Sequence, residues 1–327
     1  MKKASKLIAA ALAAGILSVM SPAPATAQTK IPFAGSLTWL GMVPVMVAIE
    51  KGYFKEQGLE IDYKVILSSY DRIRAVTAGD VVFSNLGRTA VISEMARGNA
   101  TFYYFANIDD SPGSEGCWAR TPVASIKDLK GKKIAANSSA EITMHGLLAS
   151  NGMSVKDIQF VNLPPNEMAG ALQKGDVDAA CVWQPLLDGL KAAAPSGKLL
   201  GTDMDSEMYK KFGTMASPDI VIISRKFADE RPADAGKLAT ALFKGADFAN
   251  ANPEETAKII APYFKKTPEE LLPGLRSFKY FGAKDWQEHM KKHEAQMQEL
   301  ANWLADNGKI PNKPNVANWA NYKFIPR

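Results

Sequence analysis

The sequence predicts an α/β fold, and the stretch from Ser125 to Pro185 supports this most clearly. Three apolar, β-rich runs alternate there with two segments of helical periodicity. The runs cover Lys132–Ala136, Ile158–Leu163 and Ala179–Trp183, and the helical segments lie at about Glu141–Ala149 and Glu167–Lys174. This alternation is typical of parallel strands joined by crossover helices. Small ligands bind at the carboxyl ends of such strands, which here are the turns Asn137–Ser139 and Trp183–Pro185.

The chain before this stretch shows the same alternation. From Leu59 to Val65 every second residue is apolar, which is the period of a half-buried strand. Pro44 suits the first turn of a helix, where its missing N–H costs no hydrogen bond. We expect strands at Lys30–Leu37, Leu59–Val65, Val81–Ser84 and Thr101–Ile108, and helices that begin at Pro44, in the Ser68–Asp71 loop and near Arg88.

The chain after this stretch becomes mainly helical. An apolar helix is expected at Leu186–Ala194 and a strand at Asp219–Ser224. Further helices are expected at Pro232–Asn250, Pro253–Phe264, Pro268–Arg276 and Asp285–Asp306, and an extended strap at Pro311–Arg327. The Ser, Gly and Pro residues of Asp109–Gly116 indicate the approach to a crossover between two lobes, near Cys117–Arg120, and the strand at Asp219–Ser224 would return the chain. We expect a first lobe of residues 28–117 and 222–327 and a second lobe of residues 118–221.

The N-terminus is typical of a secretory signal peptide. Lys2, Lys3 and Lys6 precede the apolar run Leu7–Met20, and Ala25-Thr26-Ala27 is an A-x-A cleavage pattern. We expect cleavage after Ala27, so that residues 1–27 are removed and the mature protein is periplasmic.

Composition excludes several classes of partner and function. The chain has 327 residues, enough for two cores, because single cores seldom grow beyond roughly 250–300 residues. Removing residues 1–27 lowers the formal net charge from +5 to +2, and no stripe dense in Lys and Arg is present. A nucleic-acid partner is therefore not expected.

Cys117 and Cys181 are the two cysteines of the chain. An oxidising compartment permits a disulfide between them. The sequence does not give the distance between their Cα atoms, so a bridge and two buried thiols both remain open.

The three histidines do not form a recognisable catalytic or metal motif. His289 and His293 have the spacing of a zinc motif but lack its Glu, and Lys291 and Lys292 beside them predict a solvated helix face. No Ser or Cys nucleophile motif lies near His145. We expect no enzyme activity, no cofactor and no metal.

Five groups of motifs, in order along the chain, resemble one family. They are Gly52–Asp62 (GYFKEQGLEID), Gly79–Val81 with Asn85–Gly87, Asp128–Ala135 (DLKGKKIA), Gly175–Ala179 (GDVDA) with Val182–Pro185, and Asp219–Val221 before Arg225–Ala228. From about residue 30 to the end, the chain resembles the periplasmic substrate-binding proteins of ABC importers for taurine, aliphatic sulfonates and nitrate. The taurine-binding branch is the most similar.

This resemblance implies the type II periplasmic binding protein fold, with two α/β lobes, two crossover strands and one ligand cleft. It implies a monomer that closes on a small organic ion without catalysis. The closed form would dock on an inner-membrane permease that works with an ATPase subunit.

The turn Ser138–Ser139 is the first candidate for ligand contact, because helix N-termini attract anions. Ser138 and Glu141 also have the spacing of a capping box, which needs no ligand. Related proteins tend to have Ser or Thr at the position of Glu141, so this residue departs from the family pattern. Its carboxylate either caps the helix or faces the cleft and favours a cation.

Two further charged residues are candidates. Arg88 departs from the small residue usual in the family, and it is expected either on the surface or as a forked donor to an anion. Asp219 matches an acidic position that the taurine branch directs toward the ligand's amine, although an Asp flanking a strand needs no ligand.

Residues in the strand-end loops complete the candidate site. Ser69, Tyr70 and Asn85 follow expected strands, and Trp39, Trp118 and Trp183 are aromatic residues that either wall the cleft or pack in the core.

The sequence leads to a hypothesis about ligand charge. Asp219, helped by Glu141, would hold a cationic group, while Arg88 and Ser138–Ser139 would hold a compact anion, as in taurine. Two alternatives remain: a different ligand, such as a thiamine-precursor pyrimidine or another nitrogen heterocycle stacked on the tryptophans, or an exported enzyme with the same fold.

Overall fold

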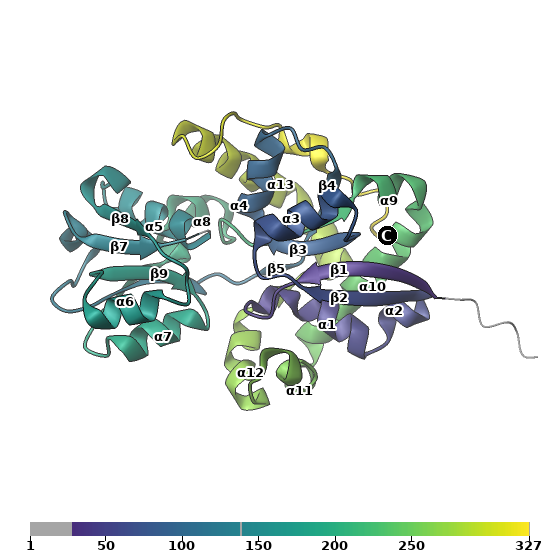
Figure 1. The fold of residues 1–327 in the computed structure, drawn as a ribbon, viewed down its shortest axis with the longest axis horizontal. Helices are drawn as coiled ribbons and strands as arrows, with labels where there is room; N and C mark the ends of the chain where they lie inside the picture. Colours follow the sequence, from purple (N-terminus) through teal and green to yellow (C-terminus); the bar gives the residue numbers. More distant parts are fainter. Residues whose placement is uncertain (1–27, 138, 327) are drawn as a thin grey trace, which may run out of the picture.

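A computed structural model describes residues 28–137 and 139–326 (Figure 1). The expected signal peptide (1–27) and Ser138 lie outside the described residues. Two five-stranded sheets dominate the structure, and helices cover each of them, which confirms the predicted α/β class. The sheets belong to two lobes that lie side by side in Figure 1, with β5 (Asp109–Asp110) between them.

The first lobe contains the sheet with strand order β2-β1-β3-β11-β4. β1 pairs in parallel with β2 and β3, whereas β11 is antiparallel to β3 and β4. Its strands are β1 (Thr29–Gly35), β2 (Leu59–Val65), β3 (Phe83–Gly87), β4 (Phe102–Asn107) and β11 (Asp219–Ser224), and β5 pairs with β12 (Lys279–Tyr280). Its helices are α1 (Val43–Glu50), α2 (Tyr53–Glu56), α3 (Ser69–Ala78), α4 (Arg88–Ala96), α9 (Arg225–Glu230), α10 (Pro232–Ala251), α11 (Pro253–Phe264), α12 (Pro268–Ser277) and α13 (Ala283–Asp306), with short 3-10 turns at Leu40–Met42 and Val316–Trp319.

The core of the first lobe has a layer of helices on each face of the sheet. On one face, Phe33 of β1 packs in a cluster with residues of α1 and α10, including Val47 and Phe243. On the other, Ile222 of β11 belongs to a cluster with residues of α3, α4 and α13, including Leu300. Both faces of the sheet are therefore buried, and the strand ends remain for a site.

The second lobe contains the sheet with strand order β10-β6-β9-β7-β8. β7 is parallel to β8 and β9, as the sequence predicted, but β6 and β10 are antiparallel additions that were not expected. Its strands are β6 (Glu115–Ala119), β7 (Lys133–Ala136), β8 (Gln159–Asn162), β9 (Ala179–Trp183) and β10 (Lys198–Thr202). Its helices are α5 (Ser139–Ala149), α6 (Met168–Lys174), α7 (Leu186–Ala193) and α8 (Glu207–Phe212), with 3-10 turns at Ile126–Leu129, Val155–Asp157 and Asp203–Asp205.

The segments that connect the lobes lie a few residues before the expected boundaries. All five residues of β6 pair with β9 in the second lobe. All six residues of β11 pair within the first lobe. The expected boundaries after residues 117 and 221 therefore fall inside continuous strands, because a hydrogen-bonded ladder keeps each strand in one sheet. The connecting segments are residues 111–114 and 213–218.

The two cysteines form a disulfide. Cys117 of β6 lies directly opposite Cys181 of β9, with 4.0 Å between the Cα atoms. The bridge is buried in the core of the second lobe. The antiparallel register of β6 against β9 thus decides between the two possibilities that the sequence left open.

The C-terminal segment runs over the first lobe. Val316 N donates to Gln298 Oε1 of α13, and the indole N–H of Trp319 donates to the carbonyl of Asn99. Ala320 bridges to Tyr104 of β4. Among the helices of residues 28–137 and 139–326, none combines the length and the apolar character that a membrane span requires.

Candidate ligand-binding site

A cleft of about 850 Å³ lies between the two lobes. The first lobe contributes the loops after β1 and β2, the start of α3 and the first residue of β11. The second lobe contributes the first residue of β6, the first turn of α5, and residues that follow β8 and β9. Seven of the predicted site residues line it: Trp39, Ser69, Tyr70, Ser139, Glu141, Trp183 and Asp219.

Two tryptophans, one from each lobe, meet in the cleft. The rings of Trp39 and Trp183 lie edge to face with centroids 6.4 Å apart. The indole N–H of Trp183 has no hydrogen-bond partner among the described residues, whereas that of Trp39 lies near the carboxylate of Asp109. Gly41 permits this arrangement, because a Cβ at this position would lie 2.5 Å from Trp39 Nε1. Trp118 is not part of the wall, since its indole donates to the carbonyl of Ala194 inside the second lobe.

Asp219 is a buried acid in the lining of the cleft. It is the first residue of β11, and its backbone N–H donates to Asp109 Oδ1 over 3.0 Å. Its side chain is buried, and Oδ2 has no partner among the described residues. Burial raises the pKa of Asp219 to about 7, with the positive charge of Arg72 opposing the rise and the negative charge of Glu115 adding to it.

Glu115 is a second buried acid in the lining, on the opposite lobe. The Ser139 hydroxyl donates to its Oε1 over 2.5 Å, and the Thr143 hydroxyl donates to its Oε2 over 2.8 Å. Burial raises the pKa of Glu115, and these two hydrogen bonds oppose the rise. Glu115 was not predicted from the sequence, because the segment Asp109–Gly116 was expected to form a connecting loop. Its position directly before the predicted crossover was the available signal.

Arg72 of α3 is the buried cation of the lining. Its guanidinium donates to the carbonyls of Ile66 and Leu67 over 2.7 and 2.9 Å, and to the Ser69 hydroxyl over 3.0 Å. Burial lowers the pKa of Arg72, and the charge of Asp219 opposes this. Arg72 was not predicted from the sequence either, although it lies three residues after the candidate Ser69.

Glu141 is paired within the protein. Its Oε1 accepts a hydrogen bond from Lys309 Nζ of the first lobe over 2.6 Å and lies 3.5 Å from His145 Nε2. The ring of His145 packs edge to face against Trp303 of α13, with centroids 5.0 Å apart. Glu141 thus lines the cleft, but its charge is balanced by a lysine that the sequence analysis did not consider.

The structure does not bring Arg88 or Asn85 to the cleft. Arg88 is fully buried, and it donates to Gln296 Oε1 over 2.7 Å and to the carbonyl of Ala216 over 3.2 Å. It is therefore neither a surface residue nor part of the cleft lining, because α4 begins against α13. Burial lowers its pKa to about 10, opposed mainly by the charge of Asp110. Asn85 donates to the carbonyl of Gly41 over 2.6 Å and so supports the loop that carries Trp39.

His293 is buried, although the sequence predicted a solvated position for it. It lies in the core, and its Nδ1 is 3.1 Å from a guanidinium nitrogen of Arg88. Burial and the charge of Arg88 hold its pKa well below the usual range. The solvated helix face predicted for His289 and His293 is therefore wrong for His293, because α13 packs against the sheet on that side.

Three buried acids hold the connecting segments. Asp203 Oδ1 accepts from the backbone N–H groups of Gly113 and Glu115, over 2.9 and 3.3 Å. Asp110 Oδ1 accepts from Met215 N over 3.0 Å. Together with the Asp109–Asp219 contact, these bonds fix the two segments beside the cleft.

One group of side chains on α13, Asp285, Glu288 and His289, comes close enough together to hold a metal ion among the described residues. It does not line the cleft, and Asp285 already lies 3.5 Å from Lys279 Nζ. It carries no argument for the function of the cleft.

The comparison with known families identifies the chain. A family model described as NMT1/THI5 like matches residues 39–256, two thirds of the chain. The chain belongs to the NMT1/THI5-like family.

Relatives of this NMT1/THI5-like protein include named binding proteins. The taurine-binding periplasmic protein of Escherichia coli (strain K12) is 27% identical over 240 residues, which cover 71% of this chain and 72% of that protein. A Brucella abortus (strain 2308) protein, provisionally named a binding protein, is 28% identical over 221 residues. That match covers 67% of this chain and 66% of the relative, slightly less than two thirds of its length.

A solved structure confirms the fold. The alkanesulfonate-binding protein SsuA from Xanthomonas axonopodis pv. citri, bound to MOPS, superposes with a TM-score of 0.72 at 18% identity. The superposition covers 90% of this chain and 99% of SsuA. The predicted two-lobed periplasmic binding protein fold is confirmed. The resemblance to periplasmic binding proteins for taurine and aliphatic sulfonates, expected from the sequence, is confirmed as well.

Proposed function

We propose that this chain is the solute-binding component of an ABC importer and that it holds a taurine-like organic ion in the cleft. The observation that carries the proposal is Asp219, a buried acid that lines the cleft between the two lobes and whose Oδ2 has no hydrogen-bond partner among the described residues. In this role the protein acts in the periplasm as a monomer, after cleavage following Ala27. It delivers its ligand to an inner-membrane permease with an ATPase subunit.

The charges of the lining favour a ligand with a cationic group. Burying a carboxylate without a partner costs several kcal/mol, more than the roughly 1–3 kcal/mol that one charge-assisted hydrogen bond returns. A simple anion such as nitrate or sulfate would leave Asp219 without a partner. An ammonium group supplies the missing donors, and the taurine-binding name of the Escherichia coli relative agrees with such a ligand.

The anion of such a ligand needs a different partner from the one that the sequence suggested. Arg88 is committed to the core contacts described above. Arg72 and Lys309 are the basic residues of the lining. Lys309 is paired with Glu141, and Arg72 retains an Nε–H without a partner among the described residues. We propose Arg72 as the residue that faces the anion.

A second candidate ligand is a nitrogen heterocycle, such as a thiamine-precursor pyrimidine. The observation that favours it is the pair Trp39 and Trp183, whose rings offer an apolar wall, together with the indole N–H of Trp183, which has no partner among the described residues. A ring nitrogen would accept from this indole, and an exocyclic amine would donate to Asp219.

A ligand screen tests the proposed function. Melting temperatures are measured with taurine, ethanesulfonate, nitrate, guanidines and pyrimidines, because a ligand that binds only the native state raises the melting temperature. The proposal expects the largest rise with taurine or a close aminosulfonate. A larger rise with pyrimidines would favour the second candidate, and tight binding of nitrate or sulfate would overturn the charge argument.

Two further measurements separate a transport protein from an enzyme. Small-angle scattering should show a smaller radius of gyration with bound ligand, because lobes joined by two short segments close like a hinge. Mass spectrometry of a ligand carried through purification should find it unchanged. A converted ligand would instead indicate an exported enzyme with this fold, although none of the described cleft-lining residues is His or Cys.

A further inference from the structure

The first turn of α5 already has an anion of its own. The hydroxyls of Ser139 and Thr143, one helical turn apart, donate to the two oxygens of Glu115. The sequence suggested that this turn would bind the anionic head group of a ligand. In the structure a carboxylate of the protein accepts hydrogen bonds from these two hydroxyls.

Glu115 is held in place by its backbone as well as by its carboxylate. Its N–H donates to Asp203 Oδ1 over 3.3 Å, and it lies opposite Trp183 in the β6–β9 ladder. Gln184, which follows the last residue of β9, donates from its backbone N–H to the carbonyl of Ser114 over 2.9 Å. Glu115 therefore presents its carboxylate to the cleft in a fixed position, so a ligand cannot easily displace it.

Asp219 presents the second carboxylate from the opposite lobe. Like Glu115 it is the first residue of a strand, its backbone N–H is bound by another acid, and its side chain is buried in the cleft lining. Unlike Glu115 it keeps an oxygen without a partner among the described residues. One lobe thus contributes a carboxylate held by two hydroxyls, and the other contributes a carboxylate with a free oxygen.

We infer that Glu115 and Asp219 form a carboxylate pair, one from each lobe, that receives the cationic group of the ligand, and that Glu115 excludes ligand anions from the first turn of α5. This inference rests on the proposed function and names the residue that sets its specificity. A purely anionic ligand would meet a like charge at α5. A ligand with a cationic group bonds to both lobes at once, so the cation itself links the lobes.

Other charged groups near the pair do not change this assignment. Arg72 donates to two backbone carbonyls and to Ser69, and Lys309 pairs with Glu141. The ligand's anion is therefore directed away from α5, toward the Arg72 side of the cleft.

The test compares three probes of similar size: taurine, with both charges; ethanesulfonate, with only the anion; and ethanolamine, with only the cation. Glu115→Gln keeps the shape of the side chain and removes its charge. By isothermal titration calorimetry, we expect this variant to bind taurine and ethanolamine at least tenfold more weakly than the native protein. We expect it to bind ethanesulfonate at least tenfold more tightly.

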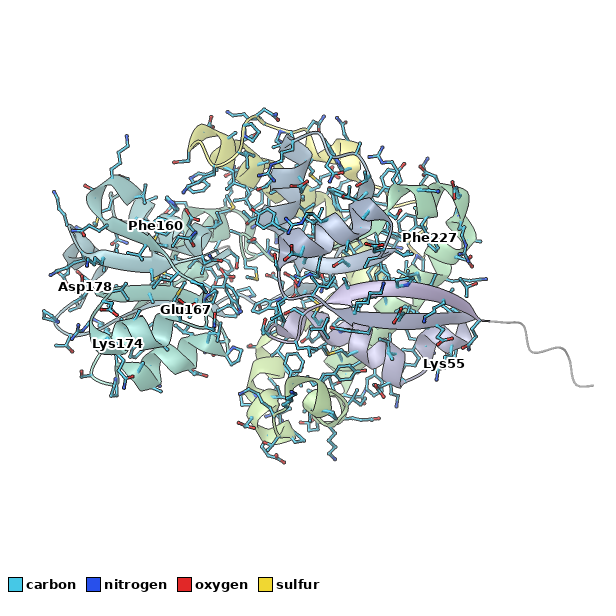
Figure 2. All side chains as sticks on the ribbon, in the orientation of Figure 1. Lys55, Phe160, Glu167, Lys174, Asp178 and Phe227 are labelled. Carbon is cyan, nitrogen blue, oxygen red and sulfur yellow. A yellow bond between two sulfur atoms is a disulfide. The ribbon has the colours of Figure 1, made fainter. Side chains whose placement is uncertain are left out.

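The matched control is Glu167→Gln, the same substitution on an exposed residue of the second lobe, before α6 and outside the cleft lining (Figure 2). It removes the same charge and should change none of the three affinities by more than about twofold. If Glu115→Gln does not fold, Glu115→Asp is used instead. That variant keeps the charge and shortens the side chain, and it should still exclude ethanesulfonate while it weakens taurine.

The outcomes separate the inference from the proposed function. Equal changes for all three probes in Glu115→Gln, or native binding of ethanesulfonate tighter than that of ethanolamine, would overturn the carboxylate pair while leaving solute binding intact. A native protein that binds none of the probes in calorimetry and shows no thermal shift with the wider screen would overturn the proposed function, and with it the inference.

Discussion

Acidic side chains are unpaired at one side of the cleft and paired at the other. Near the connecting segments, Glu115 and Asp219 are buried acids to which no basic side chain of the described residues is bonded. At the α5–α13 side, Glu141 is paired with Lys309 across the lobes, and His145 packs on Trp303. The charges of Glu115 and Asp219 need a ligand to balance them, whereas the charge of Glu141 is already balanced by Lys309. We therefore expect the first side to decide which ligand binds and the second to affect mainly how easily the lobes close.

The largest effect is expected for Asp219→Asn. Removing this charge should weaken taurine binding by about 10- to 100-fold, because the ammonium group loses its charged partner, and a charge-assisted hydrogen bond is worth roughly 1.5–3 kcal/mol. Ethanesulfonate, which lacks the amine, should not be weakened, because the variant removes a negative charge that opposes an anion. Calorimetry with both ligands measures the difference, and equal losses would remove Asp219 from the amine-binding role.

The next effect concerns pH. Because burial raises the pKa of Asp219 to about 7, its ionised fraction rises about tenfold between pH 6 and pH 8. A cationic group requires the ionised form, so taurine affinity should rise by about tenfold over this range. The groups that act on Asp219 are Arg72, Glu115 and Asp109. Asp219→Asn should bind with little dependence on pH, and an equally steep profile in that variant would assign the titration to another group.

The raised pKa of Asp219 also makes the free energy of unfolding of the unliganded protein depend on pH. The pKa of Asp219 is raised in the folded state from about 4, so between about pH 4 and pH 7 the folded state holds a proton that the unfolded state releases. The free energy of unfolding should therefore fall as the pH rises through this window. Over the whole window the loss is roughly 4 kcal/mol for this residue alone, of which roughly 2.5 kcal/mol falls between pH 5 and pH 8. Denaturant titrations of the native protein and of Asp219→Asn at pH 5 and pH 8 measure it, and a smaller loss is expected in the variant.

A smaller effect is expected at the other side of the cleft. Lys309→Met removes the partner of Glu141 and should weaken taurine and ethanesulfonate binding alike, by about two- to fivefold, because partly exposed ion pairs contribute about 0.2–1 kcal/mol. Calorimetry should show the same ratio of the two affinities as in the native protein. A change in that ratio would mean that the Glu141–Lys309 pair takes part in ligand selection.

The smallest effect on affinity is expected at the aromatic wall. Trp183→Phe keeps a ring in the cleft, so binding should change little, but the change in tryptophan fluorescence on ligand addition should fall strongly. Trp183 lies at the end of β9 against Trp39. A full fluorescence response in the variant would assign the signal to Trp39 or to Trp303 instead.

Local pattern was sufficient for most secondary structure. The expected limits of β2, β9, β11 and α11 agree with the structure at both ends. Their period-2 alternation, apolar runs and proline starts arise from neighbouring residues in the chain, so the sequence carries them directly. The short strand β10 was not predicted, because Lys198–Thr202 has no apolar alternation and is held by its pairing with β6.

The position of each charge depended on contacts between residues far apart in the chain. Arg72 and Arg88 both lie in the first turns of helices that follow strands of the first lobe, and both are buried. Only Arg72 lines the cleft, because Gln296 and His293 of α13, more than 200 residues away in sequence, surround Arg88. No local pattern distinguishes the two.

The sequence by itself therefore determined the α/β class, the order of the elements and the family, because these depend on periodicity and short motifs. It also identified Asp219, through its resemblance to an acidic position of the taurine-binding branch, and the two tryptophans that meet in the cleft, as aromatic residues of loops and strand ends. Only the tertiary structure decided that Glu115 faces α5, that Lys309 balances Glu141 and that Cys117 pairs with Cys181. Each of these depends on strand register or on packing between the lobes, which residues distant in the chain establish together.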